Sequence, residues 1–134
     1  MMVIRQIKEV CLYTDNLEAT QVFYHETLGF SIVSQVANRH IFFRVGDQVL
    51  LFFNPEVTKK EKTLPPHYAI GPQHVAFQVD QHEYEEWKNK LRREGVKIIH
   101  EQFWKEDLYS FYFHDPTGNV LEIVPPGIWE WNQT

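Results

Sequence analysis

The stretch that decides the fold runs from Ser110 to Val124 and reads Ser-Phe-Tyr-Phe-His-Asp-Pro-Thr-Gly-Asn-Val-Leu-Glu-Ile-Val. Its middle, Asp115 to Asn119, has the composition of a tight turn, because proline fixes φ, glycine accepts a positive φ, and Asp and Asn side chains bond nearby backbone. The apolar segments on both sides therefore predict a β-hairpin. Its second strand carries one carboxylate, Glu122, which needs water, a partner or a metal ion if it is buried.

Composition excludes several classes of function. The chain has 134 residues and a formal net charge of −5, and its basic residues form no block beyond Lys59-Lys60 and Arg92-Arg93, so we expect no nucleic-acid partner. No apolar run approaches the roughly 20 residues that span a bilayer, which predicts no membrane partner. The single cysteine, Cys11, and the lack of an apolar signal-peptide core predict a soluble, cytoplasmic protein.

The first half of the chain predicts the element order β-α-β-β-β. An apolar strand from Ile7 to Thr14 is followed by a helix that Asp15 or Asn16 caps, and Gly29 stands where a left-handed residue ends a helix. The strands expected next are 31–36, 41–45 and 49–53.

The second half repeats this order. A strand from His74 to Val79 precedes a helix that ends at Gly95, and Asp80 with Glu83 resembles a capping box. Three more strands are expected over 97–100, 108–114 and 120–124. We therefore predict an α+β fold, one domain over 1–134, divided into module one (1–56), a linker (57–71), module two (72–126) and a C-terminal tail (127–134).

Aligning the two halves relates four positions by the internal repeat. Glu9 aligns with His74, and Leu51 aligns with Glu122. Strand alternation places Glu9 on one face with Cys11 and Tyr13, and places His74 on one face with Ala76 and Gln78. If the halves pack about a pseudo-twofold axis, then Glu9, His74 and Glu122 are expected on the helix-free face of a curved sheet, with Leu51 in the fourth place.

The chain resembles the vicinal oxygen chelate superfamily, which includes glyoxalase I, the extradiol dioxygenases, the fosfomycin-resistance thiol transferases and the metal-free bleomycin-resistance proteins. The similar stretches are Leu17 to Tyr24 with Leu28-Gly29-Phe30, then His74 to Phe77, then Asp115 to Ile123. The resemblance covers about Ile7 to Pro125. It implies a glyoxalase/bleomycin resistance/dioxygenase-like fold, in which two βαβββ modules form a curved mixed β-sheet cup.

The resemblance also implies a metal site built from the first and last strands of each module. His74 and Glu122 match the family's ligand positions, whereas Glu9 stands where the family usually has histidine and Leu51 stands where glyoxalase I has a glutamate or glutamine. The implied ligands are Glu9, His74 and Glu122. The implied cofactor is a divalent ion (Mn, Fe, Ni, Zn or Mg), and the alternative is that no metal ion binds. Glu122 and Glu9 are also the candidate catalytic acids or bases, and a metal would act as a Lewis acid.

Other residues of this face are candidate substrate contacts. Tyr13 and Gln78 are expected to touch substrate, and Leu51 is expected to form pocket wall. Cys11 shares the face, although a lone cysteine is usually a small buried hydrophobe. The alternative interpretations are that His74 is an ordinary core histidine and that Glu9 is a water-facing acid at a strand start.

Two further segments bear on the site. His67 lies in the linker, which is expected to fold over the cup, and the tail residues Trp129 and Trp131 predict a flap or dimer contact, because exposed tryptophan is seldom left unburied. We expect a homodimer, whose modules pair within one chain or swap between two.

Three functions fit these features. The leading prediction is a metal-dependent small-molecule lyase, transferase or dioxygenase. The alternative is a non-catalytic small-molecule binding or sequestration protein of the bleomycin-resistance type. A third reading is an interaction module with a vestigial cup, which would bind neither ion nor ligand.

Overall fold

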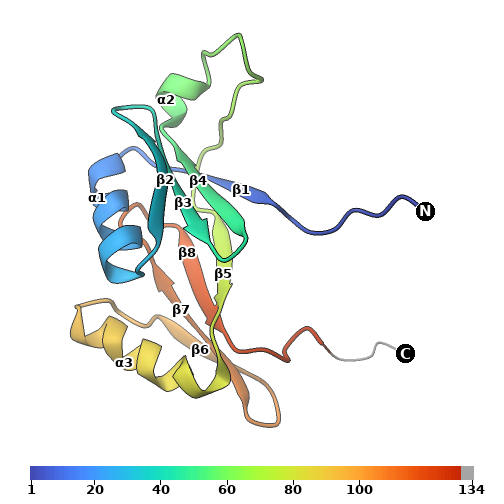
Figure 1. The fold of residues 1–134 in the computed structure, drawn as a ribbon. Helices are drawn as coiled ribbons and strands as arrows, with labels where there is room; N and C mark the ends of the chain where they lie inside the picture. The colour runs from blue at the N-terminus through green and yellow to red at the C-terminus, as the bar shows by residue number, and fades with distance from the viewer. Residues whose placement is uncertain (131–134) are drawn as a thin grey trace. The chain divides into compact units, whose positions relative to one another are not determined.

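The computed structural model describes residues 1–130 of the chain (Figure 1). The chain divides between Gly71 and Pro72 into two compact units. Each unit holds a four-stranded sheet, ordered β1-β4-β3-β2 in the first and β5-β8-β7-β6 in the second. The predicted α+β fold of two βαβββ modules is therefore confirmed.

In the first unit, aromatic residues fix the helix on one face of the sheet. The Tyr24 ring lies 4.6 Å from the ring of Phe52 and 5.5 Å from that of Phe43, and all three are buried. The neighbouring positions on these strands, such as Leu51 and Phe42, therefore lie on the opposite, helix-free face. The elements are β1 (Glu9–Tyr13), α1 (Leu17–Gln21), the π-helical η1 (Val22–Thr27), β2 (Ser31–Val36), β3 (His40–Val45), β4 (Gln48–Phe53) and α2 (Pro55–Thr58).

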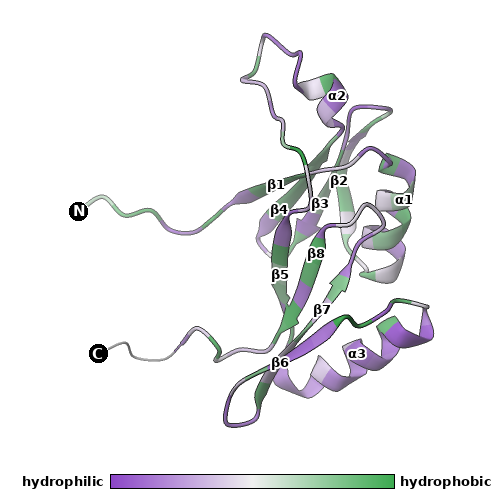
Figure 2. Cartoon of the chain, turned by 180° about the vertical axis from the view of Figure 1, so that it is seen from behind, coloured by the Kyte–Doolittle hydropathy of each residue, from purple (hydrophilic) through white to green (hydrophobic). Residues whose placement is uncertain are grey.

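The second unit repeats the arrangement with a longer helix. Tyr84 of the helix packs on Phe111 of the sheet with 5.3 Å between ring centroids, and Leu91 is fully buried. In Figure 2 this helix is largely hydrophilic, whereas β8 is largely hydrophobic. The elements are β5 (His74–Gln78), the short 3₁₀ helix η2 (Gln81–Glu83), α3 (Tyr84–Arg93), β6 (His100–Lys105), β7 (Leu108–His114) and β8 (Val120–Val124).

The turn before β8 has the expected chemistry. The Asp115 carboxylate accepts hydrogen bonds from the backbone N–H groups of Thr117 at 3.0 Å and Asn119 at 2.9 Å, and from the Asn119 side-chain amide at 2.9 Å. Gly118 takes a positive φ of 94°. The turn fixes the hairpin register, in which His114 opposes Val120.

The strand registers of the two units are equivalent, which agrees with the alignment of the halves. The parallel pair β1 and β4 places Cys11 opposite Leu51, and the parallel pair β5 and β8 places Ala76 opposite Glu122. Leu51 and Glu122 therefore occupy equivalent positions in their sheets.

Several predicted boundaries were wrong. The capping box at Asp80 does not form: this residue makes no side-chain capping bond, because the 3₁₀ turn η2 separates it from α3. The strand expected over 97–100 is instead β6, His100–Lys105, because the β6–β7 turn forms at Glu106 with a φ of 51° and offers no glycine as a signal. The linker begins with the helix α2, where the Asn54 side chain accepts from the Glu56 N–H and Pro55 fits the first turn.

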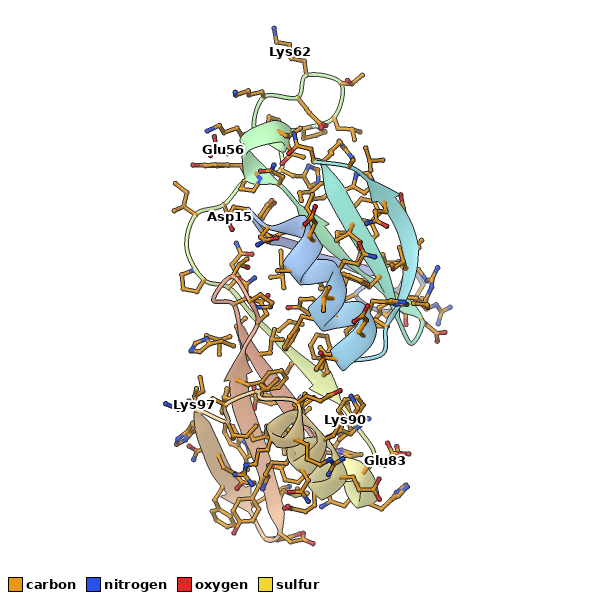
Figure 3. All side chains as sticks on the ribbon, turned by 90° about the vertical axis from the view of Figure 1, so that its left-hand side faces the viewer. Asp15, Glu56, Lys62, Glu83, Lys90 and Lys97 are labelled. Atoms are coloured by element: carbon orange, nitrogen blue, oxygen red, sulfur yellow. The ribbon has the colours of Figure 1, made fainter. Side chains whose placement is uncertain are left out.

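The surface carries the charged residues of the loops. Lys62 and Lys97, for example, are exposed and extend outward in Figure 3.

Among residues 1–130, no helix is both long enough and apolar enough to cross a membrane.

Candidate functional site

His74 and Glu122 lie together on the helix-free face of the second sheet. They come from the neighbouring parallel strands β5 and β8, and the distance between His74 Nε2 and Glu122 Oε1 is 3.2 Å. Glu122 is buried, with 6% of its surface exposed, whereas His74 is exposed. The two predicted ligands therefore point to the same face, as a shared site requires.

A hydrogen bond to the backbone determines the tautomer of His74. His74 Nδ1 lies 2.8 Å from the carbonyl oxygen of Val120, and a carbonyl only accepts, so Nδ1 carries the hydrogen. In the neutral ring Nε2 is then a bare lone pair that faces Glu122 Oε1. Two hydrogen-bond acceptors at this distance need a proton or a metal ion between them. A histidine nitrogen and a carboxylate oxygen placed in this way suit the ligands of a metal ion.

Tyr112 completes this group, and the sequence analysis missed it. Tyr112 opposes Glu122 across β7 and β8, and its hydroxyl interacts with the Glu122 carboxylate and with Ser110 strongly enough to affect its pKa. Burial first, and then the charge and hydrogen bond of Glu122, raise the pKa of Tyr112. Because the turn of a hairpin sets its register, the residue opposite Glu122 across the Asp115–Asn119 turn can be predicted from the sequence, and that residue is Tyr112.

The ring of Tyr112 also lies between two histidines. Its centroid is 6.1 Å from that of His74 and 5.8 Å from that of His100. The helix-free face of the second unit therefore presents one buried carboxylate bordered by three rings.

In the first unit, Glu9, Cys11 and Tyr13 follow one another along one face of β1. Burial and then the charge of Glu9 raise the pKa of the Cys11 thiol. Cys11 is therefore held as a thiol, which argues against a nucleophilic role. Burial raises the pKa of Tyr13 most, the neighbouring Cys11 adds to this effect, and the backbone of Tyr68 in the linker opposes it.

The remaining predicted contacts have different exposures. Leu51 is buried and opposes Cys11, whereas Gln78 is exposed at the end of β5. Glu9 is exposed at the start of β1 in the first unit, and the His74–Glu122 pair belongs to the second. Glu9 as a third ligand stays a prediction, as do the contacts of Leu51 and Gln78 with substrate.

The linker packs on the helix-free face of the first unit. The ring of His67 lies 5.1 Å from that of Phe53, and the Thr58 hydroxyl donates to the backbone carbonyl of His67. In the tail, Trp129 is 71% exposed, and Trp131 lies outside the described residues. The role of the tail stays a prediction.

A second group of potential ligands lies away from these residues. Oxygen and nitrogen atoms of Asp80, which precedes η2, and of His82 and Glu83 on η2 lie within 4.8 Å of one another. Asp80 and His82 are exposed, and exposed acidic groups of this kind are common without an ion. We assign no site to this group and use it below as a control.

Fold and geometry together define a class: proteins of paired βαβββ modules with a histidine and a carboxylate on adjacent strands of one sheet. The family comparison agrees. The model of the Glyoxalase/Bleomycin resistance protein/Dioxygenase superfamily matches residues 6–123. The protein belongs to this superfamily.

Individual relatives are named as transferases and a lyase. The chain is 27% identical over 123 residues to the glutathione transferase FosA of Serratia marcescens, covering 90% of this chain and 80% of that protein. It is 26% identical over 121 residues to the metallothiol transferase FosB of Staphylococcus haemolyticus, covering 90% and 83%. Among solved structures, lactoylglutathione lyase from Agrobacterium tumefaciens aligns with a TM-score of 0.91 and 31% identity, covering 97% of this chain and all of that one.

Proposed function

We propose that this protein is a metal-dependent small-molecule transferase or lyase whose substrates include a low-molecular-weight thiol or its adduct. The observation that carries the proposal is the arrangement of His74 Nε2 and Glu122 Oε1, 3.2 Å apart, with the other ring nitrogen of His74 bound to a backbone carbonyl. The proposed metal ligands are His74 and Glu122 of the second unit.

The thiol follows from the names of the relatives. A glutathione transferase, a metallothiol transferase and a lactoylglutathione lyase share a thiol or thiol adduct as reactant, although their reactions differ. The word metallothiol also supports a divalent ion. Since Cys11 is held as a thiol, the reacting sulfur is expected from the substrate and not from the chain.

The residues at and around the His74–Glu122 pair have separate roles in the proposed function. The Val120 carbonyl fixes the His74 tautomer that leaves Nε2 free to bind. The Tyr112 hydroxyl, whose residue opposes Glu122 in the sheet, would help to orient the Glu122 carboxylate, as groups behind metal ligands commonly do. A divalent ion with open positions would supply Lewis-acid polarisation of a substrate oxygen. Glu9 or Glu122 would take up or return a proton.

The test is metal content and metal affinity. Wild-type protein is expected to carry a stoichiometric divalent ion by mass spectrometry, which His74→Ala and Glu122→Ala both lose. Tyr112→Phe should keep the site but weaken metal binding by about 10-fold, because the Glu122 carboxylate loses the polar group that lies opposite it in the sheet. Melting temperature should rise with Mn²⁺, Fe²⁺, Ni²⁺, Zn²⁺ or Mg²⁺ concentration in wild type and not in His74→Ala.

His82→Ala is the matched control, since it removes a histidine from the exposed Asp80–His82–Glu83 group. It should bind metal as wild type does. Loss of metal in His82→Ala but not in His74→Ala would contradict the proposed site.

A non-catalytic binding protein is the second candidate. It is favoured by two departures from the ligand pattern that the family resemblance implies, Glu9 in place of histidine and Leu51 in place of a carboxylate or amide. This candidate predicts no bound ion and no metal-dependent stabilisation in wild-type protein. The same experiment therefore separates the two functions.

A further inference from the structure

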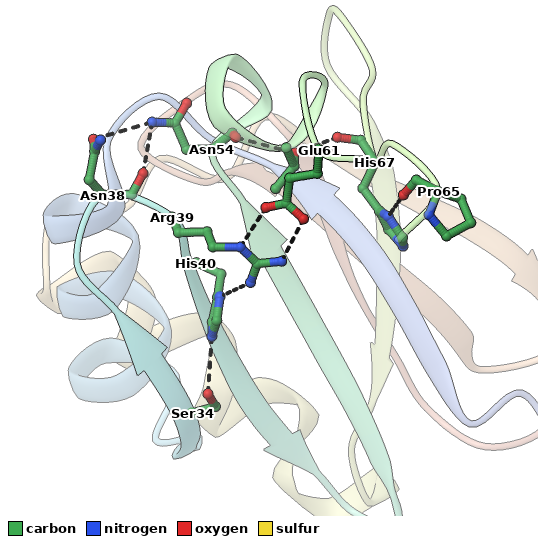
Figure 4. Close-up of polar contacts among 9 residues, drawn as sticks. Ser34, Asn38, Arg39, His40, Asn54, Glu61, Pro65 and His67 are labelled. Carbon is green, nitrogen blue, oxygen red and sulfur yellow. Dashed lines mark hydrogen bonds and ion pairs between the residues drawn. The ribbon is translucent and has the colours of Figure 1, made fainter. Parts of the chain in front are cut away.

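Four side chains of the first unit form a continuous row of hydrogen bonds, which we call the donor chain: Glu61, Arg39, His40 and Ser34 (Figure 4). The Arg39 guanidinium holds the Glu61 carboxylate at two points, with Nε to Oε1 at 2.6 Å and Nη2 to Oε2 at 3.0 Å. Arg39 Nη1 lies 2.5 Å from His40 Nδ1, and His40 Nε2 lies 3.0 Å from Ser34 Oγ.

The direction of every bond in the donor chain is fixed by Arg39. A guanidinium only donates, so His40 Nδ1 must accept, and the hydrogen of the neutral ring must lie on Nε2. His40 Nε2 therefore donates to Ser34 Oγ. His40 is not a base for Ser34, and the Ser34 hydroxyl keeps its own hydrogen for another acceptor.

The surroundings of His40 favour this neutral form. His40 is 6% exposed, stacks on Phe42 at 4.1 Å and meets the edge of Phe53 at 5.9 Å. The charged groups that face it are Arg39 and Glu61. Burial and the Arg39 charge lower the pKa of His40, and the more weakly acting Glu61 opposes them.

The donor chain ends on the face where substrate contacts are predicted. Strand pairing places Cys11 opposite Leu51, Leu51 opposite Phe42, and Phe42 opposite Ser34. These four residues form one row across the four strands of the first sheet. Ser34 therefore shares the helix-free face with Cys11 and Leu51, which the sequence analysis proposed as ligand contacts.

The side chains near Ser34 on this face are apolar, and one of them is an aromatic ring. Ser34 is half-buried, Phe42 beside it is half-buried with one ring face against His40, and Val36 is 47% exposed. A hydroxyl hydrogen next to an accessible aromatic ring matches a ligand that joins a flat apolar group to an acceptor oxygen.

We propose that Ser34 is a specificity-determining donor of the ligand site, which binds an acceptor oxygen of a ligand whose flat apolar part packs on Phe42. The acceptor is the oxygen of a carboxylate or of a neutral carbonyl. This site needs no metal ion and lies wholly in the first unit, so it stands or falls separately from the metal site at His74 and Glu122.

The experiment uses benzoate and benzamide as probes on the full-length protein after metal removal with a chelator. Binding is followed by amide chemical shifts of isotope-labelled protein, and we expect the shifts to centre on Ser34 and Phe42. Ser34→Ala should weaken binding of the preferred probe about fivefold, the loss expected for one hydrogen bond. Preference for benzoate would identify a carboxylate ligand, and equal binding would identify a carbonyl oxygen in general.

Ser31→Ala is the matched control, because Ser31 lies on the same strand, opposite Arg44, and outside the donor chain. It should bind the probes as wild type does. Equal weakening in both variants, unchanged binding in Ser34→Ala, or no binding of either probe to wild type would overturn the proposal.

The tautomer of His40 gives a second readout that needs no ligand. Long-range imidazole nitrogen spectra at pH 7 should show His40 with its hydrogen on Nε2, in wild type and in Ser34→Ala alike. A hydrogen on Nδ1 would reverse the direction of the donor chain and overturn the proposal even if the probes bind.

Discussion

At the scale of single residues, His74 and His40, which both lie on helix-free faces, are held in opposite ways. His74 donates through Nδ1 to a carbonyl and directs Nε2 toward Glu122, whereas His40 accepts at Nδ1 from Arg39 and donates through Nε2. The first arrangement suits a metal ligand and the second suits a fixed donor. The residue type is the same, and the partner at Nδ1 decides the chemistry.

His40 should make the stability of the protein depend on pH. Its pKa in the folded protein is lowered from 6.5, so folded and unfolded chains are both neutral at His40 well above pH 6.5. As pH falls below this value, the unfolded chain binds a proton that the folded chain does not. The free energy of unfolding therefore decreases until the pH reaches the lower pKa of His40 in the folded protein.

Urea unfolding at pH 8.0 and pH 5.5 tests this expectation in wild type and His40→Gln. At pH 8.0 the variant should lose about 1–3 kcal/mol, because its partners in the donor chain are left unpaired. The loss of stability between the two pH values should be smaller in His40→Gln than in wild type. An equal loss in both proteins would show that His40 is not the titrating group.

At the scale of elements, the Asp115–Asn119 turn controls the position of β8 and hence of Glu122. Asp115→Ala removes the acceptor of two hydrogen bonds from Thr117 and of two from the buried Asn119. We expect the free energy of unfolding to fall by about 2–3 kcal/mol, the cost of buried donors left unpaired, as measured by urea unfolding.

Asp107→Ala is the comparison for this variant, since Asp107 is an exposed acid in the turn between β6 and β7. It should change stability by less than about 0.5 kcal/mol, as surface substitutions usually do. If the two variants cost the same, the Asp115 bonds would not be what holds the turn.

Elements with strong local chemistry were predictable from the sequence, and elements set by long-range packing were not. Gly29 and Gly95 end their helices with φ near 85°, as expected, and the hairpin around Gly118 follows from its turn residues. The end of β6 at Lys105 could not be predicted, because the turn that follows it uses Glu106 in place of glycine. The π-helical end of the first helix, where the Leu28 N–H reaches the Phe23 carbonyl, also leaves no signal in composition.

The candidate site was predictable to the same extent. Strand alternation and the internal repeat led to His74 and Glu122, which the structure brings together. Tyr112 was missed although the hairpin register determines it. The donor chain was beyond prediction, because Glu61 reaches Arg39 from the linker across 22 residues.

At the scale of the whole molecule, exposed aromatic side chains support the expected homodimer. Phe103 and Tyr109 are 51% and 41% exposed on the β6–β7 hairpin with their rings 5.3 Å apart, and Trp129 is 71% exposed. Large exposed apolar groups that lie together commonly mark an interface.

We expect sedimentation velocity to give about twice the chain mass of 16.0 kDa at micromolar concentration. If the hairpin is the interface, the double variant Phe103→Ser/Tyr109→Ser should sediment as a monomer while Trp129→Ser remains a dimer, and the reverse would place the interface at the tail. A twofold interface repeats every contact, so substitutions at its centre should weaken association more than a single copy of each contact suggests. A constant mass near 16 kDa at all concentrations, in wild type, would contradict the dimer and leave these rings available for a different partner.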